Sequence, residues 1–157
     1  DFFISVHFKV DNVDKGWGVF VYMSTDKAIR ASQWRLLEEE KLSWGDTWFL
    51  IGDWNDLCSM AEKKGGRVRS DFSFAHFNSF IQNMEMDEVS MVGYQFTWGN
   101  NRDAEGFVEE KLDRAYGSFE WFNTFLEASV LNIARSASDH SLILLNTGCK
   151  SENQKKK

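Results

Sequence analysis

Near the middle of the chain lies the stretch Trp48-Phe49-Leu50-Ile51-Gly52-Asp53-Trp54-Asn55, and it decides the fold. Its first four residues form a continuous apolar run, which is typical of a short central strand buried on both faces. Asp53 is therefore expected where that strand ends, held by a rigid element and open to solvent through the following loop. Taken alone, the motif favours a simpler interpretation, in which Asp53 caps a turn that Asn55 supports through a hydrogen bond.

On the N-terminal side of this strand, the apolar pattern predicts a hairpin and a helix. Residues 2–10 and 16–23 are expected to form two antiparallel strands, joined by a polar turn at residues 11–15. Helical spacing of apolar residues then marks residues 26–42 as a surface helix, with Thr25 or Asp26 near its cap.

On the C-terminal side, the pattern predicts a second helix, a short third helix and several strands. The second helix is marked by the apolar spacing of Phe77, Phe80, Ile81 and Met84. The other expected elements are strands at 96–98, 110–116, 129–134 and 141–145 and a helix at 118–125. This order of elements favours an α/β or α+β layered sandwich. No repeat or linker divides the chain, so we predict one domain over residues 1–148 and a polar, lysine-rich tail over residues 149–157.

The composition limits the possible partners. The net charge of −6 does not predict attraction of the whole molecule to a nucleic-acid backbone, so a nucleic-acid substrate would need a local basic patch and a metal. Basic side chains do gather at residues 63–69, which we expect to be a solvated loop, although it could touch a DNA backbone. Cys58 and Cys149 show no metal-ligand or disulfide pattern, and no apolar run reaches membrane-span length, which predicts a soluble protein without a membrane partner.

Two further acidic motifs lie at the edges of predicted strands. Asp113, in Leu112-Asp113-Arg114, falls within a strand, where an unpaired carboxylate would be costly, so it requires a partner such as Arg114 or an imidazole from elsewhere. If the partner is His140, of Ser138-Asp139-His140, then Asp113 would orient that ring and raise its pKa. For the second motif alone, a polar surface loop is the more common interpretation.

Taken together and in this order, the motifs resemble the endonuclease/exonuclease/phosphatase superfamily. The resemblance is carried by residues 48–55, 62–66, 96–98, 110–114 and 138–141, and it extends over about residues 19–145. Within the superfamily, the chain looks most like the apurinic-like endonuclease domain of plant non-LTR (LINE-type) retrotransposons. The resemblance implies a DNase I-like, four-layered sandwich of two packed mixed β-sheets flanked by helices. It also implies hydrolysis of DNA phosphodiester bonds with Mg²⁺ or Mn²⁺, in a nuclear or cytoplasmic location.

The resemblance assigns roles to individual residues. Asp53 would align and activate the attacking water, Asn55 would contact the phosphate or a metal-bound water, and Asp139 would belong with both of them to the metal site. His140 would contact the phosphate, and Asp113 would orient His140. Four further positions are assigned to the substrate: Tyr22 to a phosphate, Arg30 as a basic contact, and Trp98 with Asn100 to base stacking. Tyr22 is equally compatible with the core edge, and Trp98 with the core itself.

The resemblance also exposes a gap at the start of the chain. In the family, the first strands carry an Asn and a Glu that bind the metal, and that region would lie upstream of Phe2, as in an N-terminally truncated copy lacking its first strands. Mg²⁺ is held by few carboxylates, so losing one should weaken its binding severely. We therefore expect little or no activity from these 157 residues. The alternatives are a phosphomonoesterase of the same superfamily and a non-catalytic domain that binds nucleic acid or protein.

Overall fold

The computed structural model describes residues 1–100, 102, 106–134 and 138–148. The strands are β1 (Phe3–Val10), β2 (Val13–Tyr22), β3 (Trp48–Asp53), β4 (Lys63–Lys64), β5 (Met86–Glu88), β6 (Met91–Val92), β7 (Trp98–Gly99), β8 (Glu109–Glu110), β9 (Asp113–Ser118), β10 (Ser129–Ile133) and β11 (Leu142–Asn146). The helices are α1 (Lys27–Glu40), α2 (Ala75–Met84) and α3 (Phe119–Thr124), with single 3-10 turns η1 (Lys41–Ser43), η2 (Met60–Glu62) and η3 (Asp71–Phe74). The predicted tail at 149–157 lies outside the described residues.

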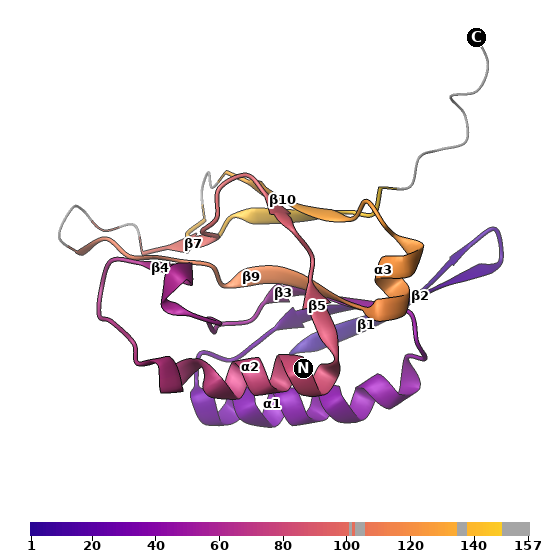
Figure 1. Ribbon diagram of the computed structural model, residues 1–157, viewed down its shortest axis with the longest axis horizontal. Coiled ribbons are helices and arrows are strands. Elements are labelled where there is room, and N and C mark those ends of the chain that lie inside the picture. Colours follow the sequence, from indigo (N-terminus) through magenta and orange to yellow (C-terminus); the bar gives the residue numbers. More distant parts are fainter. Residues whose placement is uncertain (101, 103–105, 135–137, 149–157) are drawn as a thin grey trace, which may run out of the picture.

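A five-stranded mixed sheet forms the centre of the molecule, with strand order β1-β2-β3-β9-β5 (Figure 1). Strand β3 pairs in parallel with β2 and antiparallel with β9, so it is a central strand, as its apolar run predicts. Trp48 and Leu50 are buried on one face of β3, and Ile51 is buried on the other.

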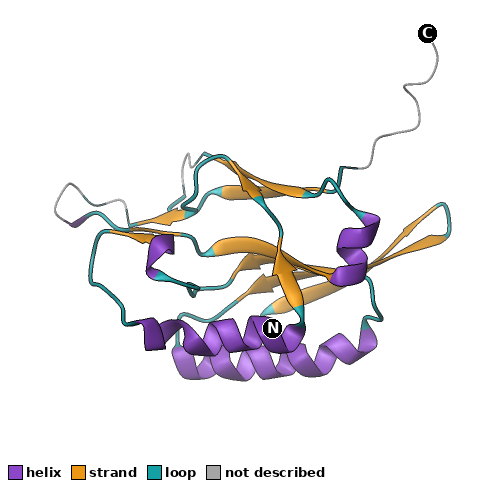
Figure 2. Ribbon diagram, viewed as in Figure 1, coloured by secondary structure: helices purple, strands orange, loops and turns teal. Residues whose placement is uncertain are grey.

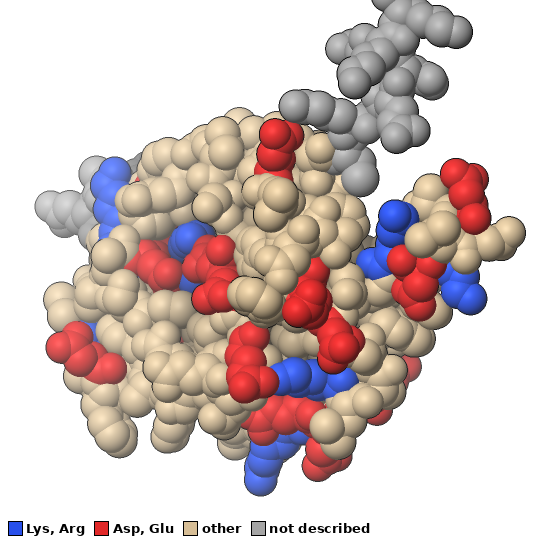
Figure 3. Space-filling model, turned by 45° about the vertical axis from the view of Figure 1, so that its right-hand side comes forward, with Lys and Arg blue, Asp and Glu red and all other residues tan. Residues whose placement is uncertain are grey.

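The predicted N-terminal hairpin is present, but its turn is shorter than the polar segment suggests. Strand β2 begins at Val13, and only Asp11 and Asn12 form the turn, with φ angles of 50° and 63°. Two-residue hairpin turns need positive φ at both positions, and Asp and Asn tolerate it better than other non-glycine residues. Figure 3 shows the hairpin standing out from the body of the molecule, with acidic and basic side chains at its tip.

Helices α1 and α2 lie side by side over one face of the five-stranded sheet (Figure 2). Trp34 of α1 stacks on Phe77 and Phe80 of α2, with 5.5 Å between ring centroids in both pairs. Trp54, which directly follows β3, is fully buried against the same two phenylalanines. This aromatic cluster joins the helices to the end of β3 and so fixes the backbone next to Asp53.

A second mixed sheet, of order β11-β10-β6, covers the opposite face of the central sheet (Figure 1). Between the two sheets lies a core that includes Ile51, Ala115, Trp121 and Val130. The described residues thus form three layers: helices, central sheet and second sheet. Within that part of the chain no helix covers the outer face of the second sheet, where a fourth layer was expected (Figure 2).

Two expected strands are broken up in the structure. The segment predicted at 110–116 divides into β8 and β9, and the segment at 96–98 contributes only β7, which joins β4 and β8 in a small third sheet. The break falls at Lys111 and Leu112, whose backbone groups bond outside the ladder, Lys111 N–H to Glu62 and Leu112 C=O to Trp54. Among the described residues, no helix has the length and apolar character that crossing a membrane requires.

Candidate active site

Strand register brings two of the predicted carboxylates together. Asp53 is the last residue of β3 and Asp113 the first of β9, and they are direct partners in the antiparallel β3–β9 ladder. Direct partners in such a ladder project their side chains to the same side of the sheet. The two aspartates therefore meet at one end of the central sheet, although 60 positions separate them along the chain.

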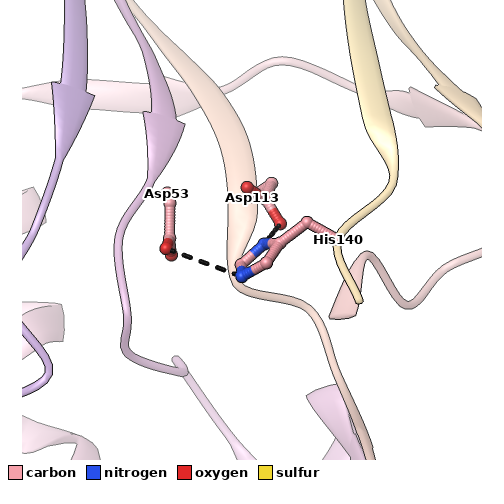
Figure 4. Close-up of side chains that lie close together, drawn as sticks. All are labelled: Asp53, Asp113 and His140. Atoms are coloured by element: carbon pink, nitrogen blue, oxygen red, sulfur yellow. Dashed lines mark hydrogen bonds and ion pairs between the residues drawn. The ribbon is translucent and has the colours of Figure 1, made fainter. Parts of the chain in front are cut away.

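The loop before β11 brings His140 to the same place. His140 forms an isolated antiparallel bridge with Trp98, and the N–H of Ser141 donates to the carbonyl of Thr97 at 2.6 Å. In Figure 4 the imidazole lies between the two carboxylates. Its Nδ1 lies 2.9 Å from Asp113 Oδ2, and its Nε2 lies 3.9 Å from Asp53 Oδ2. The pairing of Asp113 with an imidazole rather than with Arg114 is thus confirmed.

Asp113 is held firmly enough to orient the imidazole. The hydroxyl oxygen of the buried Thr97 accepts hydrogen bonds from the backbone N–H groups of Leu112 at 3.0 Å and Asp113 at 2.8 Å. These bonds replace ladder bonds at the break between β8 and β9, and the sequence pattern did not reveal this role of Thr97. The hydrogen bond with Asp113 raises the pKa of His140, while partial burial opposes the change.

Asp53 lies in a different environment. Burial, together with the nearby carboxylate of Asp113, raises the pKa of its carboxyl group to about 6. Two hydrogen bonds from Asn55 oppose this increase. Asn55 donates from its backbone N–H to Oδ1 at 2.9 Å and from Nδ2 to Oδ2 at 2.8 Å. A carboxyl group with such a pKa can exchange a proton near neutral pH, as a general base must.

Asn55 supports the turn, as the simpler interpretation of this motif proposes. Its backbone has φ of 49°, and its Nδ2 group also donates to the carbonyl of Met23 at 2.8 Å. Both amide hydrogens are therefore used within the protein, which leaves the amide oxygen to contact a ligand. Asn55 thus fixes Asp53 relative to the end of β2, and its contact with phosphate or metal stays a prediction.

Asp139 lies beside the cluster, and its side chain points to another partner. Its carboxylate is exposed and accepts a hydrogen bond from Trp98 Nε1 at 3.0 Å, which lowers the pKa of Asp139. The group whose ligand atoms lie within 4.8 Å of one another consists of Asp53, Asp113 and His140 only, among the described residues. The assignment of Asp139 to a metal site stays a prediction.

The four predicted substrate contacts occupy different environments. Tyr22 is the β2 partner of Asp53 in the parallel ladder and is 68% exposed, so it lies at the rim of the site and not in the core. Trp98 is half-buried and bound to Asp139. Asn100 closes its own loop by donating to the carbonyl of Gly106 and accepting from the N–H of Val108. Its neighbour at position 101 lies outside the described residues.

Arg30 is buried, not projected into solvent. Its guanidinium donates to the carbonyl of Ser24 at 2.7 Å and to Asp56 Oδ2 at 2.9 Å. Asp56 also accepts a bond from Arg69 at 2.9 Å, so one buried carboxylate binds two arginines. The loop at 63–69 is therefore tied to the body of the protein, and Lys63 is also ion-paired, with Glu110. Residues 64–68, between these two anchored positions, are exposed, as expected of a solvated loop.

Arg114 has a structural role that the sequence did not disclose. Its side chain is fully buried and pairs with Glu62 through two bonds, at 2.8 and 2.9 Å. Successive strand residues point to opposite faces, so Arg114 cannot share the face on which Asp113 meets His140. The two-residue alternation of side chains along a strand was the sequence signal that could have predicted the direction of Arg114.

The ligand atoms can hold a metal ion. A Mg²⁺ ion takes oxygen ligands and keeps several waters, with one or two carboxylates and substrate phosphate completing its shell. Asp113 is engaged with His140, whereas Asp53 pairs with no lysine or arginine among the described residues, and burial raises its pKa. The carboxylate of Asp53, with the amide oxygen of Asn55 beside it, therefore fits such an ion.

Comparison with solved structures identifies the fold. The chain matches the endonuclease domain of TRAS1, a telomere-specific non-LTR retrotransposon, with TM-score 0.69 and 15% identity over 92% of this chain and 63% of that one. A 3′-5′ exonuclease from Neisseria meningitidis gives TM-score 0.58 and 13% identity over 87% of this chain and 66% of that one. A beta toxin variant from Staphylococcus aureus with bound magnesium ions gives TM-score 0.57 and 14% identity over 92% and 53%.

These similarities show that the chain has the DNase I-like fold, which it shares with the TRAS1 endonuclease domain and the Neisseria exonuclease. The chain spans about two thirds or less of the length of each of these proteins. Comparisons with protein-family models and with curated proteins gave no match.

Proposed function

We propose that this chain carries the phosphodiesterase site of a DNA endonuclease of the retrotransposon type, which uses Mg²⁺ or Mn²⁺. The observation that supports it is the arrangement of Asp53, His140 and Asp113, which combines a proton acceptor, a proton donor and an orienting carboxylate within 4.8 Å. The fold shared with the TRAS1 endonuclease domain and with an exonuclease agrees with this reaction class.

In the proposed reaction, Asp53 aligns the attacking water and accepts its proton. Burial raises the pKa of this carboxyl group to about 6 in the metal-free protein, so Asp53 is there a stronger base than an ordinary aspartate. Asn55 keeps the carboxylate in place through its two hydrogen bonds. Water would attack the phosphorus atom from the side that Asp53 faces, opposite the leaving oxygen.

The imidazole of His140 supplies the complementary charge. Asp113 accepts a hydrogen bond from Nδ1 at 2.9 Å and favours the protonated ring, so Nε2–H is free to donate to a phosphate oxygen. The distance of 3.9 Å from Nε2 to Asp53 is too long for a hydrogen bond, which leaves Nε2 available for a substrate atom. A bound divalent cation would supply further positive charge to the phosphate oxygens.

The test is nicking of supercoiled plasmid by the 157-residue chain with Mg²⁺ or Mn²⁺, compared with Asp53→Asn and His140→Ala. We expect slow nicking that requires the metal, because the described residues leave one carboxylate, Asp53, for the ion. Both substitutions should abolish nicking, because removing a general base or a donor that stabilises charge on the phosphate lowers the rate about 100-fold or more. His76→Ala changes an imidazole on α2 and is the matched control.

The results of the nicking assay distinguish the proposed function from its alternatives. Nicking equal in wild type and both variants would contradict the proposed site. Fast nicking by the wild type would contradict the expectation that the Asp53 site binds the metal weakly. Release of phosphate from a monoester without DNA cleavage would favour the phosphomonoesterase alternative, and DNA binding without any metal-dependent turnover would favour a non-catalytic domain.

A further inference from the structure

A basic cavity opens beside the candidate active site. It has a volume of about 450 Å³ and lies where the start of α1, the residues after β3 and the segment before η3 meet. In Figure 1 this is the end of the helix layer at which α1 and η3 begin. Its lining includes Lys27, Arg30, Arg67 and Arg69, with Asn55 at the side of the active site.

The cavity has more positive than negative charge. Of its four cationic side chains, Arg30 and Arg69 share the single carboxylate of Asp56, so a surplus of about three positive charges remains. Lys27 and Arg67 are exposed, and neither side chain forms an ion pair or hydrogen bond with another described residue. Asp26 caps the start of α1 with its carboxylate, so the helix end itself adds little to this surplus.

Arg30 carries an unsatisfied donor. Its side chain is 3% exposed, and its Nε–H has no hydrogen-bond partner among the described residues, although the guanidinium donates elsewhere to Ser24, Thr25 and Asp56. A buried donor without a partner costs free energy, so such groups call for an explanation by an unseen ligand or water. Arg30 lines the cavity, so its guanidinium adds positive charge to the cavity wall, while the Nε atom itself is buried beneath that surface.

Asn55 connects the cavity to the active site. It lines the cavity and at the same time donates from Nδ2 to Asp53 Oδ2 at 2.8 Å. An anion in the cavity would therefore be separated from the reacting phosphate by about the width of one side chain. In a DNA strand, phosphates follow one another at about 3.4 Å along the helix axis, so a second phosphate lies near the one that is attacked.

We propose that this cavity binds a backbone phosphate of a nucleic acid, next to the phosphate that the Asp53–His140 site attacks. The inference rests on the proposed function and narrows its substrate to a polymer of phosphodiesters. A substrate with a single phosphate would fill the site between Asp53 and His140 and leave the cationic cavity without an anion. The cavity also supplies the local basic patch that a chain with net charge −6 needs to bind DNA.

The test measures binding separately from cleavage. Fluorescence anisotropy with a labelled DNA duplex in EDTA compares the wild type with Arg67→Gln, Lys27→Gln and the double variant. We expect each single substitution to weaken binding about threefold to tenfold for two unrelated sequences, and to reduce the slope of log K against log salt by about 1. Lys9→Gln is the matched control, because Lys9 is exposed in the β1–β2 hairpin beyond the part of β2 that pairs with β3, and this variant should bind like the wild type.

Both pocket residues are exposed, so their substitution should leave the melting temperature unchanged, and this is measured in parallel. Unchanged DNA affinity in the double variant would overturn the inference. The inference would also be overturned if the double variant lost binding to phosphatidylserine vesicles but still bound DNA, because the cavity would then recognise a lipid. If Asp53→Asn abolishes nicking while the double variant binds and cleaves normally, the proposed function stands and this inference fails.

Discussion

At the scale of single residues, the site is governed by an imbalance of charge. Two carboxylates and one imidazole have ligand atoms within 4.8 Å, so one imidazolium must balance two anions in a partly desolvated space. Asp113 takes the imidazole as its partner, and Asp53 keeps its proton to higher pH. The site thus contains a proton donor, His140, and a proton acceptor, Asp53, and the pKa values of both are raised above their ordinary values.

The first prediction concerns His140. Its pKa, followed by NMR titration of the ring protons, should lie above 6.5 and should fall in Asp113→Asn, because the hydrogen bond with the Asp113 carboxylate is the largest cause of the increase. The folded state then binds the proton more tightly than the unfolded state, so this pair contributes stability fully below about pH 6.5 and loses it as pH rises through the raised pKa. His76 is the internal control. An unchanged His140 pKa in the variant would contradict the assigned partner.

The second prediction concerns Asp53. Its pKa rises from 3.8 to about 6 on folding, so ionising it costs the folded state free energy that grows between these pH values and is complete above the higher one. The full cost is about 3 kcal/mol, since each pKa unit corresponds to about 1.4 kcal/mol. Asp53→Asn removes this cost but loses about one hydrogen bond from Asn55, worth about 1 kcal/mol.

In EDTA, Asp53→Asn should therefore raise the melting temperature at pH 8 by about 3 to 6 °C, from a net gain of about 1 to 2 kcal/mol. At pH 5 the gain should be smaller, because the folded wild type then keeps its proton. Thermal denaturation followed by circular dichroism at both pH values measures the difference. A variant that is less stable than the wild type at pH 8 would show that Asp53 is not under electrostatic strain.

At the scale of elements, the end of β3 depends on a glycine. Gly52 has φ of 149°, and a Cβ at this position would lie 2.0 Å from the carbonyl oxygen of Val21 on the neighbouring strand. The close approach of β2 and β3 at this point brings Tyr22 and Asp53 to the same rim. Gly52 is thus a requirement of the site as well as of the sheet.

The third prediction follows from this contact. Gly52→Ala should destabilise the protein by about 3 kcal/mol or more, since the backbone must move and φ is unfavourable for alanine. Gly45→Ala is the matched control: its φ is 69°, but nothing lies within 4 Å of the added Cβ, so the cost should be about 1 kcal/mol. Denaturant unfolding of both variants measures the difference. Equal costs would mean that the approach of Val21 is not rigid.

Elements with a strong local pattern could be predicted from the sequence, whereas contact-dependent ones could not. The apolar run of β3 and the amphipathic spacing of α2 each specify their element locally. Strands β5 and β6 escaped prediction because they are two or three residues long and exist only through pairing with β9 and β10. The expected continuous strand at 110–116 was wrong because Thr97 and Glu62, distant in sequence, capture its backbone.

The candidate site could be predicted only in part for the same reason. Strand ends marked Asp53 and Asp113 as candidates, but their direct pairing depends on the β3–β9 register, which no local pattern encodes. The motif Ser138-Asp139-His140 marked His140 as a candidate, and the family resemblance added its expected contact with phosphate. The partners of Asp56 and the meeting of Arg30 with the basic residues 67 and 69 in one cavity depend on side chains that come together through folding, and the sequence pattern did not reveal them.

At the scale of the whole molecule, the outer face of the second sheet is apolar and exposed. Leu131 and Ile133 of β10 and Leu142 and Leu144 of β11 are between 38% and 67% exposed. They form two cross-strand pairs, Leu131 with Leu144 and Ile133 with Leu142, so all four project on one face. Val130, Asn132 and Ile143 alternate with them and face the central sheet. A contiguous patch of this kind favours association or aggregation of a soluble protein.

The last prediction tests that face. The double substitution of Leu142→Lys and Leu144→Lys should reduce the fluorescence of the dye ANS and the light scattering of concentrated solutions, because lysines interrupt both cross-strand pairs at the sheet edge. The fold should persist, since both side chains already contact solvent. Leu42→Lys is the matched control, because Leu42 is 88% exposed but stands alone on η1. If ANS fluorescence falls equally in the control, single exposed leucines and not this sheet face bind the dye. If it falls only in the double variant, the outer face is the main apolar surface of the chain, and the molecule needs a cover there or a low concentration to remain monomeric.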